Sequence, residues 1–115
     1  MTPVKQQGTS SRRGKTRIAV TKSAIVTSLD GARQFACTIS DFSKDGARVA
    51  VTKAAHGLEE CYLINMAERT AHKSAVKWRS NREIGLSYLR TISLADIEDP
   101  ALGFLLSAWM KHATR

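Results

Sequence analysis

The chain has 115 residues, a length that suits one domain and excludes two domains of ordinary size. Its 43% hydrophobic and 24% charged residues are typical of a globular protein, and its net charge of +8 predicts an anionic partner. Cys37 and Cys61 are far apart and belong to no CxxC pair, which excludes an ordinary zinc site. No apolar run is long enough for a membrane helix or forms a signal segment, so we expect a cytoplasmic protein without membrane insertion.

Two polar segments open the chain. Residues 1–11 are poor in apolar side chains and predict a flexible tail. A basic segment follows, and its residues Arg13 and Arg17 have the spacing RxxxR, with Arg12 directly before them. This segment is either a solvated basic arm or part of a binding site for an anion.

Strand-like segments then follow one another. Residues 18–27 are rich in β-branched side chains, and Asp30-Gly31 is typical of a hairpin turn. Apolar and polar residues alternate in the later segments, and Val76 and Trp78 are expected on one face of theirs. We read Asp41–Gly46 as a turn between two strands. The other predicted strands cover residues 35–40, 47–51, 61–64, 70–78 and 84–88. Six short strands without an intervening helix predict a small antiparallel barrel or sandwich, and a barrel would leave no exposed edge strands.

The last part of the chain, residues 96–115, predicts a helix packed on the barrel. Asp99-Pro100 is a typical helix start. Four apolar residues then fall on one helical face: Leu102, Leu105, Leu106 and Trp109. Phe104 lies opposite, and we expect it to be either an exposed apolar residue or a contact with a partner.

The residues that flank the second predicted strand suit a guanine nucleotide. The planar fork of an arginine matches the O6 and N7 acceptors of guanine and also pairs with phosphate oxygens. The carboxylate of Asp41 can accept hydrogen bonds from guanine N1–H and N2–H, and Ser43 can donate or accept beside it. Gly46 leaves room for a close backbone approach. Alternatively, Asp41 and Ser43 only close a turn through bonds to the backbone.

The segment Asp41–Gly46 has the pattern DxSxxG, and together with RxxxR it resembles the PilZ domain, a bacterial receptor for cyclic di-GMP. Val76-Lys77-Trp78 and Ile84-Gly85-Leu86 are similar to the closing strand pair of that family. The resemblance implies a mainly β, six-stranded antiparallel barrel over residues 12–95, followed by a C-terminal helix. It also implies cyclic di-GMP as the ligand, without a further cofactor, and an unknown protein partner that receives the signal. The ligand residues would be Arg12, Arg13, Arg17, Asp41, Ser43 and Gly46.

Two other functions stay open. A small basic barrel can bind single-stranded nucleic acid, although only 6% of the residues are aromatic and Phe35, Trp78 and Tyr88 are expected to point toward the core. A PilZ scaffold can also serve protein contacts alone, although such scaffolds lack the arginine motif. We expect no enzyme, because no nucleophile elbow occurs and His56, His72 and His112 lie in separate segments.

Overall fold

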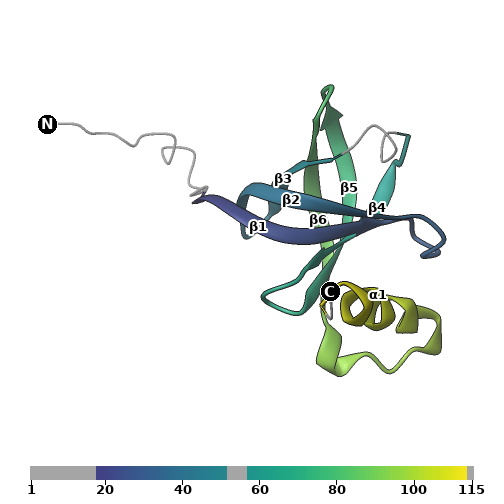
Figure 1. Cartoon of the computed structure of the whole chain (residues 1–115). Helices are drawn as coiled ribbons and strands as arrows, with labels where there is room; N and C mark the ends of the chain where they lie inside the picture. Colours follow the sequence, from purple (N-terminus) through teal and green to yellow (C-terminus); the bar gives the residue numbers. More distant parts are fainter. Residues whose placement is uncertain (1–17, 52–56, 114–115) are drawn as a thin grey trace, which may run out of the picture.

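The protein forms a closed antiparallel barrel of six strands with one helix beneath it, as the sequence predicts (Figure 1). This computed structural model describes residues 18–51 and 57–113. The strands follow the order β1-β2-β3-β6-β5-β4 around the barrel. Their bounds are β1 Ile18–Thr27, β2 Gln34–Ser43, β3 Gly46–Ala50, β4 Glu60–Asn65, β5 Thr70–Arg79 and β6 Glu83–Ser93. Short 3-10 turns at Leu94–Asp96 and Pro100–Leu102 lead to α1, Gly103–Ala113.

The β1–β2 hairpin closes as the Asp30-Gly31 signal predicts. Gly31 has φ of +79°, the left-handed region that side chains disfavour. The carboxylate of Asp30 accepts hydrogen bonds from the N–H of Ala32 at 2.9 Å and from the hydroxyl of Ser28 at 2.7 Å. These local bonds fix the turn and with it the register of β1 and β2.

Two apolar cores share the strand β4. Alternate side chains point into the barrel, where Cys61 and Leu63 pack with residues of the other strands. Tyr62 and Ile64 point outward from the barrel and pack against α1. Because both faces of β4 are covered, its sequence is apolar throughout the run Cys61–Ile64 instead of alternating.

The helix packs through a face that differs in part from the predicted one. Leu105 and Ala108 are buried against the barrel, whereas Leu106 is 39% exposed and lies outside the contact. Phe104 is neither isolated nor free for a partner, because its ring packs edge-on against Tyr62 with centroids 5.9 Å apart. Ala108 is buried at this contact, whereas the sequence pattern places Leu106 there.

The start of the helical segment agrees with its predicted cap. The side chain of Asp99 accepts a hydrogen bond from the N–H of Ala101 at 2.9 Å, and Pro100 opens the turn that leads into α1. Within residues 18–51 and 57–113, no helix is long and apolar enough to cross a membrane.

Candidate functional site

The structure places half of the predicted ligand residues. Arg12, Arg13 and Arg17 lie outside the described residues, as does the predicted tail over residues 1–11. Asp41 and Ser43 lie on β2, and Gly46 begins β3. The prediction of one turn over Asp41–Gly46 is therefore wrong, because strand pairing continues to Ser43 and only residues 44–45 make the turn.

A single row of paired residues crosses five strands at this site. In strand register, Ala19 pairs with Asp41 and Asp41 with Arg48. Arg48 in turn pairs with Gly85, and Gly85 with Trp78. Residues in such a row lie about 5 Å from their neighbours and those that share a face can interact. The chain segment that precedes β1 is thus joined to the barrel beside Asp41.

An ion pair occupies the middle of this row. The guanidinium Nη2 of Arg48 lies 3.0 Å from Oδ2 of Asp41, and its Nε lies 3.7 Å from Oε2 of Glu83. The side chain of Asp41 is 13% exposed, and that of Arg48 is 47% exposed. The carboxylate is thus largely shielded from water, while the cation reaches the surface.

Ser43 and Gly46 hold the turn and the strands in place. The hydroxyl of Ser43 is buried and accepts a hydrogen bond from the N–H of Asp45 at 3.3 Å. This bond to the backbone closes the turn, which is the alternative role that the sequence allowed for Ser43. A Cβ atom at Gly46 would collide with the backbone oxygen of Leu86 on the neighbouring strand. Gly46 therefore serves the close approach of β3 and β6.

Trp78 belongs to the site, although the sequence predicted that it points toward the core. The β5–β6 register shifts between Val76 and Trp78, so these two residues face opposite sides of the sheet. Val76 packs against the barrel core, and Trp78 is 44% exposed. Its indole lies across Gly85, where a Cβ atom would collide with it. A glycine inside a strand is the signal for such a close approach.

A cleft of about 330 Å³ lies beside this row, and of the predicted ligand residues that the structure describes, Asp41 lines it, whereas Ser43 and Gly46 do not. Asp41 and Arg48 line one part of it, and Lys77 and Trp78 line another. The cleft offers a flat aromatic face, two cations and one shielded carboxylate. Such groups can stack on a base, pair with phosphate and accept hydrogen bonds from a base edge.

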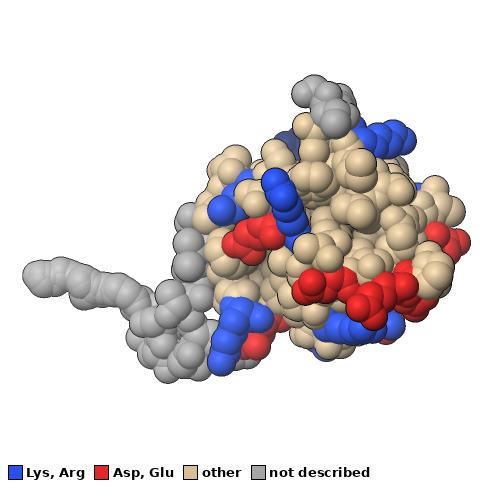
Figure 2. Space-filling view, turned by 90° about the horizontal axis from the view of Figure 1, so that it is seen from below, with Lys and Arg blue, Asp and Glu red and all other residues tan. Residues whose placement is uncertain are grey.

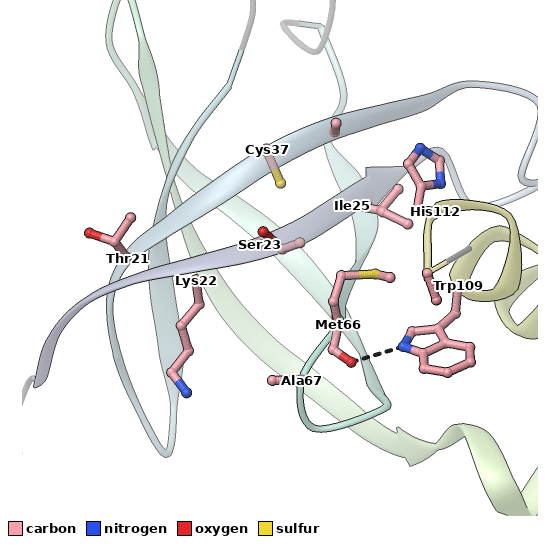
Figure 3. Close-up of a pocket in the computed structure, with 12 residues that line it drawn as sticks. Thr21, Lys22, Ser23, Ile25, Cys37, Met66, Ala67, Trp109 and His112 are labelled. Carbon is pink, nitrogen blue, oxygen red and sulfur yellow. Dashed lines mark hydrogen bonds between the residues drawn. The ribbon is translucent and has the colours of Figure 1, made fainter. Parts of the chain in front are cut away.

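A larger cleft of about 610 Å³ lies elsewhere, between β1, β2 and the end of α1 (Figure 3). Ile25, Met66 and His112 lie around it, and the indole N–H of Trp109 donates to the backbone oxygen of Met66 at 2.9 Å (Figure 3). It is lined by none of Asp41, Ser43 and Gly46. We place the candidate site at the smaller cleft because Asp41 and its ion-pair partner Arg48 line it together with Trp78, whereas the described residues that line the larger cleft include no carboxylate.

The described cysteines and His72 are buried or packed in the fold. Burial raises the pKa of Cys37 and of Cys61 to about 12, so both free thiols stay protonated at neutral pH. Burial also lowers the pKa of His72, whose ring stacks on Tyr88 with centroids 3.9 Å apart. Within the described ranges, no group of three potential metal ligands occurs.

The positive charge is unevenly distributed along the chain. Five of the 18 Lys and Arg residues fall in the first 17 residues, which contain no Asp or Glu. All ten Asp and Glu residues belong to the described part, where Figure 2 shows acidic and basic side chains next to each other on one face. The described part of the barrel is therefore close to neutral, and the segment before β1 carries much of the excess charge.

Comparison with known proteins adds no assignment, because no protein-family model and no curated protein matches this chain.

Proposed function

We propose that this protein is a PilZ-like receptor that binds cyclic di-GMP and passes the signal to a protein partner. One observation carries the proposal: Ala19, two residues after the RxxxR motif, pairs directly with Asp41 of the DxSxxG motif. The strand that directly follows the RxxxR motif in sequence therefore begins beside the DxSxxG motif. This proximity is what a shared ligand requires.

The groups around Asp41 suit the chemistry of the two halves of the ligand. The carboxylate accepts hydrogen bonds from guanine N1–H and N2–H, and the exposed indole of Trp78 offers a stacking surface for a base. The arginines of the preceding segment supply charge-assisted bonds to phosphate or to the O6 and N7 edge of guanine. The barrel provides a fixed platform and no catalytic step.

Calorimetric titration with cyclic di-GMP, GTP and cyclic di-AMP tests the proposal. We expect cyclic di-GMP to bind most tightly, because adenine presents an acceptor at N1 and lacks the N2 amine. An unpaired polar group costs about 1–3 kcal/mol, so discrimination against cyclic di-AMP should be about tenfold or more. Equal affinity for the two dinucleotides would contradict the role of Asp41.

Matched variants separate ligand contacts from folding. Arg13→Ala or Arg17→Ala should remove most binding and leave the thermal midpoint of the free protein nearly unchanged. Val49→Ala should do the reverse, because Val49 is fully buried in the barrel core and its truncation leaves a cavity. A large loss of midpoint in the arginine variants would mean that these residues support the fold instead.

The exposure of Trp78 favours one second candidate, the binding of single-stranded nucleic acid. Trp78 and Lys77 line the same cleft, and an exposed aromatic beside a cation is the pairing on which single strands stack. A short oligonucleotide in the same titration series tests this function. Binding of the oligonucleotide more tightly than cyclic di-GMP would favour it over the receptor role.

A further inference from the structure

The carboxylate that would receive guanine is already engaged by a cation of the same barrel. Arg48 pairs with Asp41 in the strand register, and its Nη2 lies 3.0 Å from Oδ2 of that carboxylate. A guanine edge that donates two hydrogen bonds to Asp41 needs both carboxylate oxygens, and the guanidinium already contacts one of them, Oδ2. Base and arginine therefore compete for one group.

A second acidic residue holds the same guanidinium from another strand. Oε2 of Glu83 lies 3.7 Å from Nε of Arg48, and that Nε also donates to the hydroxyl of Ser40 at 3.4 Å. Ser40 lies within hydrogen-bond reach of Glu83 at 3.5 Å and of the backbone oxygen of Arg48 at 3.1 Å. Arg48 therefore keeps two anchors, Glu83 and Ser40, when its contact with Asp41 opens.

We propose that Arg48 is a built-in competitor that sets the affinity and selectivity of the site, and that Glu83 draws it away from Asp41 when a guanine binds. The inference rests on the proposed binding of cyclic di-GMP. In the free protein Arg48 neutralises the shielded carboxylate. In the complex the guanine edge takes its place, and the guanidinium remains on Glu83 at the border of the cleft.

The effect has a predictable size and direction. Because Arg48 is about half exposed, its pair with Asp41 has the modest strength of a partly solvated ion pair. Removing the competitor should tighten the binding of cyclic di-GMP about two- to fivefold. A ligand that makes no bond to Asp41 gains nothing, so the preference for cyclic di-GMP over cyclic di-AMP should rise by the same factor.

Three variants test the competition by calorimetry. Arg48→Met keeps the stem of the side chain and removes the charge, and we expect tighter binding of cyclic di-GMP. Glu83→Gln removes the charged anchor and leaves Arg48 with Ser40 and with its ion pair to Asp41, so we expect weaker binding. The double variant lacks the arginine that Glu83 would hold, so the loss of Glu83 should have no further effect there. Its affinity should equal that of Arg48→Met, which makes the effects of the two substitutions non-additive.

Arg90→Met is the control for general loss of positive charge, because Arg90 is exposed on β6 and does not line the cleft. The affinity of this variant for cyclic di-GMP should be unchanged or slightly lower. Unchanged or weaker binding in Arg48→Met would overturn the competitor role while leaving the receptor role intact. If Arg48→Met does not fold, Glu83→Gln alone decides, and tighter or unchanged binding there overturns the inference. Absence of cyclic di-GMP binding by the unmodified protein overturns both proposals.

Discussion

At the scale of single residues, two glycines shape the site by what they leave out. Gly46 lies where the backbone oxygen of Leu86 approaches, and Gly85 lies beneath the indole of Trp78. The two collisions that a Cβ atom would cause differ in kind. An indole can rotate away from the sheet, whereas the Leu86 backbone is fixed by the β3–β6 pairing. Gly46 therefore supports the close approach of β3 and β6, and its assignment to the ligand stays a prediction.

Gly46→Ala should destabilise the barrel by about 1–3 kcal/mol, the usual cost of forcing an extra methyl group into a packed position. Gly103→Ala is the matched control, because Gly103 has helical φ of −58° and its Cβ position is open. It should stabilise the protein by about 0.4–1 kcal/mol. Urea unfolding of both variants measures the difference. Equal midpoints would mean that Gly46 is kept free for the ligand.

At the scale of elements, strands were predictable where local pattern and tertiary pairing agree. The predicted segment 18–27 coincides with β1, because β-branched residues run through it and a glycine turn ends the hairpin. The apolar run at 61–64 was also read as a strand, although its burial on both faces follows only from the position of α1. Local sequence thus determined where most strands lie, but not what covers them.

The site was less predictable than the fold, because it depends on register. Nothing local in the sequence pairs Arg48 with Gly85, since β3 and β6 are distant in the chain. The bulge before Trp78 also reverses the face that strict alternation predicts. Gly85 within a strand was the available sign of a close approach. The competitor Arg48 has no comparable sign in the sequence.

The contact face of α1 gives a test at this scale. Leu105 is fully buried between α1 and the barrel, so Leu105→Ala should cost about 2–5 kcal/mol of unfolding free energy. Leu106→Ala should change it by no more than about 0.5 kcal/mol, because that side chain is 39% exposed. Chemical denaturation of the pair distinguishes the observed face from the predicted one. Similar losses in both variants would restore the stripe predicted from the sequence.

At the scale of the whole molecule, the net charge of +8 does not belong evenly to the barrel. The ten acidic residues balance most of the cations in the described part, whereas the first 17 residues carry five cations and no acid. The excess positive charge of the chain therefore belongs chiefly to the segment that precedes β1 in sequence. That segment leads into the strand in which Ala19 pairs with Asp41.

This distribution predicts how salt should separate the two candidate ligands. Cyclic di-GMP has two phosphates, so its binding can displace only about two counterions and should weaken gradually as salt rises. A single strand that runs along the five cations would contact more phosphates and lose affinity steeply, with a logarithmic slope of about 0.7 for each phosphate neutralised. Calorimetry with both ligands over a series of salt concentrations measures the slopes. We expect a shallow slope for cyclic di-GMP and weak oligonucleotide binding that disappears at moderate salt.

A variant lacking residues 1–17 should retain the barrel, which contains both apolar cores, and lose the salt-dependent part of binding. Unchanged affinity in that variant would exclude the arginine segment from the site.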